Sequence, residues 1–83
     1  MEYRWSSTAI KQLNKLVQFD RRRIVIKLDE WFGQPDPLDF AKRLSGYKVA
    51  TFRFRIGSYR IIAERDSNVL TIVRVADRKD AYR

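Results

Sequence analysis

The chain has 83 residues, of which 45% are hydrophobic, so we expect residues 1–83 to fold as one domain with a modest core. It contains no cysteine and no histidine, which excludes disulfide bonds, thiolate or imidazole metal ligands, and histidine acid–base catalysis. Eighteen Lys and Arg residues against ten Asp and Glu residues give a net charge of +8, and this excess favours a polyanionic partner.

Hydropathy along the chain favours a cytoplasmic protein. The first residues contain no apolar run typical of a signal peptide, and no segment approaches the roughly 20 apolar residues that span a bilayer. A membrane-surface role is the least favoured of the anionic partners, because no segment predicted to be helical pairs a basic face with a strongly apolar one. Nucleic acid and acidic proteins therefore stay as the expected partners.

The first elements are predicted to be a strand and a helix. Aromatic and charged residues alternate over Glu2–Trp5, a pattern typical of a short strand. Ser6 and Ser7 are suited to cap a helix. Apolar residues recur at helical spacing after this cap, at Ile10, Leu13, Leu16 and Val17.

A second helix is predicted directly afterwards. Asp20 is a candidate for its cap, and Gly33 is expected to end it. Its apolar stripe comprises Ile24, Leu28 and Trp31, widened by Val25 and Phe32, and Pro35 and Pro37 prevent a restart. Two amphipathic helices joined by so short a link are expected to form an antiparallel pair.

The second half of the chain changes to strand periodicity. After a turn or short helix around Leu38–Leu44, strands are expected at Val49–Ile56, Tyr59–Glu64 and Val69–Ala76. Short turns at Gly57-Ser58 and at residues 66–68 would join them into an antiparallel meander. The predicted fold class is α+β: a two-layer sandwich in which the N-terminal strand and the antiparallel helix pair pack on the C-terminal meander.

Several arginines fall where they can gather on one face of this meander. Arg53 and Arg55 are two residues apart and so project from the same side of one strand, and Arg60 begins the next strand. Arg78 follows the last strand, while the facing of Arg74 is left open by the pattern. Any one of them can be a solvated surface charge, but the set, with Tyr59 and Tyr82 expected nearby, favours phosphate binding, because guanidinium groups bind phosphate in a bidentate way.

The aromatic residue next to the C-terminus, Tyr82, is open to three interpretations. It can be a surface aromatic, a platform on which a base stacks, or a group that transfers a proton. Its position in the sequence alone favours the first.

Two segments resemble the RelE/ParE toxin superfamily. The stretch Arg55-Ile56-Gly57-Ser58-Tyr59-Arg60 has the pattern R-x-G-x-Y-R, and Asp77–Tyr82 has the pattern D-R-x-x-x-Y. The resemblance extends over nearly the whole chain and implies a toxin of a type II toxin–antitoxin system. In the RelE branch, such a toxin enters the ribosomal A site and cuts mRNA there.

The resemblance implies a catalytic set of five residues, namely Arg53, Arg55, Arg60, Arg78 and Tyr82. They would support attack of the 2′-hydroxyl on the scissile phosphate, with no metal and no cofactor. The two strand positions are often lysine in the family but are arginine here, and arginine is a poor general base. Tyr82, with its phenol pKa lowered by surrounding cations, is then the better candidate for that role.

Partners are implied in the same way. The resemblance implies a cognate antitoxin, acidic and partly disordered when free, besides the ribosome and its mRNA, and no membrane. The run Arg21-Arg22-Arg23 on the second helix can contact RNA or the antitoxin, although a solvated helix face is the simpler interpretation.

Two other functions stay open. A ParE-like inhibitor would bind DNA gyrase and cleave nothing. A non-catalytic module would bind RNA with a salt-dependent affinity and leave it intact.

Overall fold

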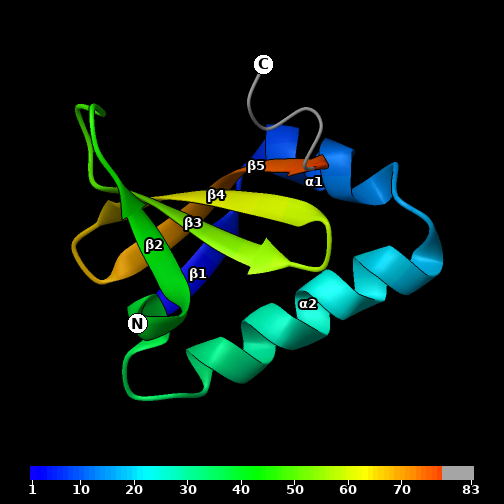
Figure 1. Cartoon of the computed structure of the whole chain (residues 1–83), viewed down its shortest axis with the longest axis horizontal. Coiled ribbons are helices and arrows are strands. Elements are labelled where there is room, and N and C mark those ends of the chain that lie inside the picture. The colour runs from blue at the N-terminus through cyan, green and yellow to red at the C-terminus, as the bar shows by residue number, and fades with distance from the viewer. Residues whose placement is uncertain (78–83) are drawn as a thin grey trace.

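The computed structural model describes residues 1–77, which build a five-stranded mixed sheet and two helices that contribute to one core (Figure 1). The elements in chain order are β1 (Glu2–Trp5), α1 (Ser7–Asn14), α2 (Gln18–Phe32), a 3₁₀ helix (Pro37–Phe40), β2 (Ala41–Leu44), β3 (Thr51–Ile56), β4 (Tyr59–Asp66) and β5 (Val69–Asp77).

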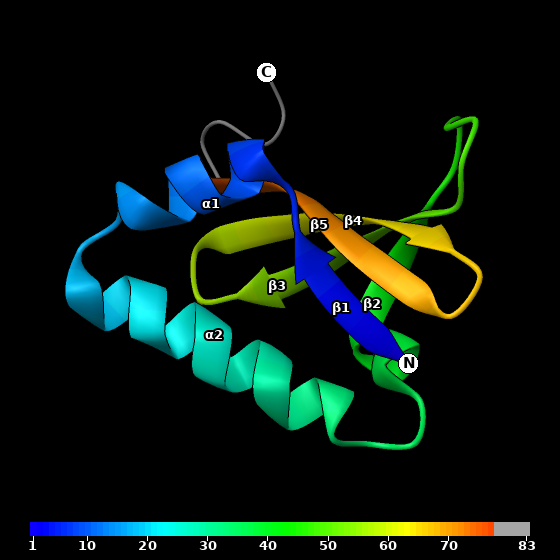
Figure 2. The ribbon, with the colours of Figure 1, turned by 180° about the vertical axis from the view of Figure 1, so that it is seen from behind.

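The strand order in the sheet is β1-β5-β4-β3-β2. Strands β3, β4 and β5 form the antiparallel meander predicted from the sequence, and the α+β class is confirmed. The two outer strands extend this meander on both sides. Strand β1 lies parallel to β5, so the first strand of the chain pairs with the last (Figure 2), and β2 is antiparallel to β3.

The core lies between the helices and one face of the sheet. Strands β3 and β4 alternate, so that Phe54, Ile56, Ile61 and Ala63 turn to the helices. They pack against Ala9 and Leu13 of α1, Ile24 and Leu28 of α2, and Leu70, Ile72 and Val75 of β5. Burial of a large apolar side chain contributes about 1.5–3 kcal/mol each, so this cluster accounts for most of the stability that the small fold can have.

Helix α1 begins where the sequence predicts, and the predicted Leu13 and Leu16 contribute to the core, but two other predicted positions do not. The Ser6 hydroxyl accepts a hydrogen bond from the Ala9 N–H at 3.1 Å, which caps the helix. Ala9 and Leu13 are buried, whereas Ile10 and Val17, which were expected on the apolar side, are exposed. The prediction was wrong at these two positions because the small Ala9, and not Ile10, approaches the sheet most closely.

Helix α2 uses the predicted stripe but not the predicted cap. It begins at Gln18 after Val17, without a side-chain cap, and Ile24 and Leu28 are fully buried. Asp20 lies inside the first turn, where its carboxylate accepts a hydrogen bond from the Tyr59 hydroxyl at 2.8 Å. Its role is therefore to attach the helix to β4 and not to cap the helix.

A second tyrosine attaches the other end of α2. The Tyr3 hydroxyl on β1 donates to Asp29 at 2.5 Å. Burial, followed by this hydrogen bond, raises the pKa of Tyr3, and the hydrogen bond to Asp20, followed by burial, raises the pKa of Tyr59. Both tyrosines therefore keep their hydroxyl proton to a higher pH than a free tyrosine does.

The segment around Leu38–Leu44, expected as a turn or short helix, contains both a 3₁₀ helix and a strand. The Asp36 carboxylate caps the 3₁₀ helix by accepting from the Leu38 N–H at 3.1 Å. Phe40 then stacks on Trp31 with ring centroids 5.4 Å apart. The strand β2 was not foreseen, because its four residues are too few to show an alternating pattern.

The core argument predicts a contrast between two isoleucines of α2. Ile24 is fully buried, whereas Ile26 is 57% exposed. We expect Ile24→Ala to lower the free energy of unfolding by about 2–5 kcal/mol, and Ile26→Ala to change it by no more than about 0.5 kcal/mol. Urea denaturation of both variants measures the difference. Equal losses would show that α2 packs on the sheet through another face.

The two tyrosine hydrogen bonds predict a loss of stability in alkali. Because folding raises both pKa values, their contribution is fully present below about pH 10, the unfolded value, and is lost as the pH rises towards the folded values. We therefore expect the Tyr3→Phe/Tyr59→Phe double variant to be less stable than the parent at neutral pH, and this gap to narrow above about pH 10. Chemical denaturation across pH tests this, and a constant gap would contradict it.

Candidate functional site: a cationic face of the sheet

The alternation that buries the core on one side of the sheet places cations on the other. Arg53 and Arg55 of β3 alternate with the buried Phe52, Phe54 and Ile56. Arg55 pairs with Arg60 of β4, so these three arginines share the outer face of the sheet, as predicted. We call the outer side chains Lys42, Arg53, Arg55, Arg60 and Arg74 the cationic face.

These cations lie in two rows that cross the strands. In the first row, Lys42 of β2 pairs with Arg53, Arg53 with Ile62, and Ile62 with Arg74. The second row contains Arg55, Arg60 and Ala76. Side chains paired directly across strands have Cβ atoms about 4.5–5.5 Å apart, so Arg55 and Arg60 oppose each other as like charges.

A register shift in β5 decides where Arg74 points. Ile62 pairs with Arg74 but the next residue, Ala63, pairs with Ile72, so Val73 is an extra residue on β5. The shift lets Ile72 face the core while Arg74 joins the outer face. The sequence left this facing open, because a bulge of one residue leaves no signature in the hydrophobic pattern.

Arg60 is the most constrained member of the cationic face. Its side chain is only 3% exposed, and its Nε atom is buried with no hydrogen-bond partner in the described part of the chain. A buried charged group without compensating hydrogen bonds costs several kcal/mol. An anion bound beside such a group would offset this cost.

A hollow of about 610 Å³ lies over the first row. Its lining includes Lys42, Arg53 and Arg74, together with Glu64, the one carboxylate among its residues. Tyr47, in the β2–β3 connection, also lines it and is largely exposed. Lys42 and Tyr47 were missed in the sequence, because only the pairing of β2 with β3 brings them to this face.

Three other residues expected at the site are placed differently or not at all. Tyr59, expected near the arginines, is on the core side with its hydroxyl bound to Asp20, because it alternates with Arg60 along β4. That expectation was wrong. Arg78 and Tyr82 lie outside the described residues.

Within residues 1–77, no three potential ligand side chains are grouped so that they could hold a metal ion. No helix among these residues is long and apolar enough to cross a membrane. What the cationic face can do is bind phosphate groups: rigid guanidinium donors match phosphate oxygens, and the adjacent hollow can take a base or sugar next to them.

One family model and several solved structures match this chain. The model of the family described as "ParE toxin of type II toxin-antitoxin system, parDE" matches residues 3–82. A search of curated proteins finds no match.

Several solved structures have the same fold. The RelB–RelE antitoxin–toxin complex of Methanococcus jannaschii contains a chain that is 27% identical (TM-score 0.75; 94% of this chain and 93% of that chain covered). A chain of the archaeal RelE–RelB complex of Pyrococcus horikoshii OT3 is 25% identical (TM-score 0.74; 96% of this chain and 97% of that chain covered). A chain of the RelBE2 toxin–antitoxin complex of Mycobacterium tuberculosis is 28% identical (TM-score 0.75; 95% of this chain and 92% of that chain covered).

The family match covers almost the whole chain, and the similar structures are RelE toxins. The resemblance drawn from the R-x-G-x-Y-R and D-R-x-x-x-Y segments is thereby confirmed. The chain belongs to the RelE/ParE toxin superfamily of type II toxin–antitoxin systems.

Proposed function

We propose that this toxin is a ribosome-dependent endoribonuclease, which cuts mRNA without a metal and so inhibits translation. The observation that carries the proposal is the cationic face with the buried guanidinium of Arg60 at its centre. The similarity to structures of RelE toxins supports it. The ribosome and its mRNA are cytoplasmic, so the protein would act there.

The reaction uses a nucleophile that RNA itself supplies. The 2′-oxygen attacks the adjacent phosphorus, a bond from the 2′-oxygen to phosphorus forms, and the bond from phosphorus to the 5′-oxygen breaks. The products are a 2′,3′-cyclic phosphate and a 5′-hydroxyl. Arg53, Arg55 and Arg60 would stabilise the additional negative charge on the phosphate oxygens in the transition state.

Two protons must move in this reaction, one from the 2′-hydroxyl and one to the 5′-oxygen. Tyr82 is proposed as the base or as a stacking platform, and Arg78 as the group that neutralises the leaving oxygen. Lys42 is the one member of the cationic face that is not an arginine, and it pairs with Arg53. A lysine ammonium can exchange a proton where arginine cannot, so Lys42 is a further candidate for proton transfer beside its proposed contact with phosphate.

The proposal includes a cognate antitoxin as the second partner. The similar structures are toxin–antitoxin complexes, and the net charge of +8 favours an acidic antitoxin that orders as it binds.

An inhibitor of DNA gyrase is the second candidate function, because the matching family is described as ParE toxin. A gyrase inhibitor would leave mRNA intact, and its effect would not depend on the charge of Arg60. The test below separates the two.

Replacing Arg60 by methionine should separate activity from stability. Methionine keeps most of the aliphatic volume and removes the buried charge, so we expect the free energy of unfolding to stay or to rise by on the order of 1 kcal/mol. Cleavage of a defined mRNA on purified ribosomes should fall about 10²–10³-fold. Primer extension maps the cuts, and thermal denaturation measures the stability.

The matched control for this experiment is Arg65→Ala, an exposed arginine further along the same strand. It should cleave as the parent does. Ribosome-dependent cleavage that survives Arg60→Met would refute the site, whereas intact mRNA with inhibited gyrase would favour the ParE-like function. Salt-dependent RNA binding without cleavage would favour a non-catalytic module.

The hollow predicts roles for Tyr47 and Lys42 in RNA binding. Stacking of a base on Tyr47 is worth about 1–3 kcal/mol, so Tyr47→Ala should weaken binding of a short oligoribonucleotide about tenfold and Tyr47→Phe should not. Lys42→Ala should reduce the slope of log affinity against log salt concentration by about 1, the change expected when one phosphate contact is lost. Fluorescence anisotropy at several salt concentrations measures both, and unchanged affinity and slope would exclude RNA from the hollow.

A further inference from the structure

Gln12 of helix α1 binds the backbone of strand β5 through its side chain. Its Oε1 atom accepts a hydrogen bond from the Val75 N–H at 2.7 Å, although the two residues are 63 positions apart in the chain. Figures 1 and 2 both show α1 beside the C-terminal end of β5. The bond is partly buried, and it connects the helix layer to the sheet.

This bond is made where strand β1 has ended. Strand β5 lies between β1 and β4. Its pairing with β1 extends only to Trp5 and Ile72, after which the Ser6 N–H donates to the Ile72 carbonyl oxygen at 2.9 Å. Beyond Ile72, that side of β5 has no strand partner in residues 1–77, and a buried backbone N–H needs an acceptor. Gln12 therefore supplies to Val75 the acceptor that a neighbouring strand would otherwise supply.

The same bond holds the peptide group that follows Arg74. The Val75 nitrogen belongs to the peptide that joins Arg74 to Val75, and a peptide group is planar. A hydrogen bond that fixes the direction of this N–H therefore also restrains the rotation about the Cα–C bond of Arg74. Gln12 acts in this way on the backbone of a cation that belongs to the cationic face.

The restraint falls where the register of β5 is irregular. Val73 is the extra residue of the strand, and Arg74 follows it directly. Without the shift, the regular pairing would continue with Arg74 opposite Ile61. Ile61 is fully buried in the core, so Arg74 would then point to the core side. Because a bulge interrupts the ladder locally, the strand pairing alone restrains this position less than it does a regular one.

The simplest role of the Gln12 bond would be to attach α1 to the sheet. Ala9 and Leu13 already do this, because both are buried in the core cluster together with residues of β5. A bond that only added to this packing would serve equally well at other positions of β5. It is made instead to the peptide next to Arg74, two residues after Val73, where it can determine the facing of the side chain.

We infer that Gln12 is a positioning residue for Arg74. It holds the shifted register at the end of β5 and so keeps the Arg74 guanidinium among the phosphate ligands of the cationic face. The inference rests on the proposed binding of RNA at that face, and it adds to it a residue of the helix layer.

The test measures binding of a short oligouridine to the full chain by fluorescence anisotropy at several salt concentrations. The slope of log affinity against log salt concentration reports how many phosphates the protein's cations contact. Because Gln12 is uncharged, its replacement changes this slope only if a cation moves. Cross-strand nuclear Overhauser contacts between Ile62 and Arg74 report the register in the absence of RNA.

Gln12→Met keeps the length of the side chain and removes the acceptor oxygen. We expect Gln12→Met and Arg74→Ala each to reduce the slope by about 1, the loss of one phosphate contact. The double variant should lose no more than either single variant, because both changes remove the same contact. The contact between Ile62 and Arg74 should weaken in Gln12→Met. Gln12→Asn, whose amide ends one carbon short of Val75, should act in the same direction and replaces Gln12→Met if that variant does not fold.

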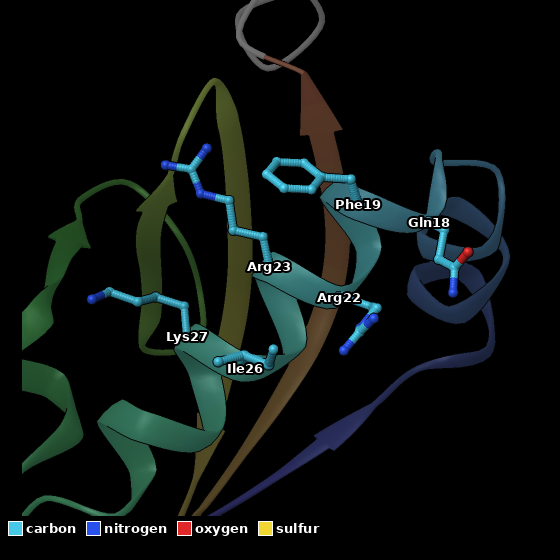
Figure 3. Close-up of a pocket in the computed structure, with 6 residues that line it drawn as sticks. All are labelled: Gln18, Phe19, Arg22, Arg23, Ile26 and Lys27. Carbon is cyan, nitrogen blue, oxygen red and sulfur yellow. The ribbon is translucent and has the colours of Figure 1, made fainter.

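The matched control is the same substitution at another glutamine, Gln18→Met. Gln18 is exposed at the start of α2 and lines a hollow of about 690 Å³ together with other residues of that helix (Figure 3). This variant should keep both the parental slope and the contact between Ile62 and Arg74.

A parental slope with an intact contact between Ile62 and Arg74 in Gln12→Met would overturn the inference. So would losses of slope that add in the double variant, because Gln12 would then act on a different cation. A parent protein that does not bind oligouridine would refute RNA binding at the cationic face. The contact between Ile62 and Arg74, measured without RNA, would then decide by itself whether Gln12 positions Arg74.

Discussion

The alternation of side chains along β3 and β4 is the constraint on which both the core and the candidate site depend. Phe54 and Ile61 can be buried only if Arg53 and Arg60 point to the other side. A shift of one residue in this pairing would expose the core and place guanidinium groups in it. The hydrophobic energy that folds the chain therefore also fixes the relative positions of the arginines, and no separate interaction is needed to hold the cationic face together.

Arg60 shows what that arrangement costs. Arg55 lies directly opposite it, and Arg60 itself is nearly inaccessible to water. Like charges on paired positions and a buried charge both oppose folding. The burial of the apolar faces of β3 and β4 offsets these costs, and Gly57, with φ of 61°, allows the tight turn that joins the two strands. Unfavourable charge concentrated in one hairpin is typical of a binding site and not of a structural surface.

The sequence predicted those features that follow from periodicity. It located β1, both helices, the meander and the common facing of Arg53, Arg55 and Arg60. The sequence did not predict the role of a residue where one tertiary contact determines it. Asp20 has the chemistry of a cap but is bound by Tyr59, which comes from a strand 39 residues away. Features that exist only through pairing had no local signal, as in the short β2 with Lys42 and the shift at Val73 that turns Arg74 outward.

Arg23 of helix α2 approaches the β3–β4 turn, which joins two strands of the cationic face. A Cβ atom on Gly57 would lie 2.9 Å from a terminal nitrogen of Arg23, so the guanidinium of α2 rests against the turn that connects Arg55 to Arg60. Glycine is favoured there for its positive φ, whereas the flexible end of the Arg23 side chain could move away from a Cβ atom at little cost. The turn joins the strands on which Arg55 and Arg60 oppose each other, so the packing of Arg23 connects α2 to this end of the cationic face. That connection is local packing and requires no rearrangement of the sheet.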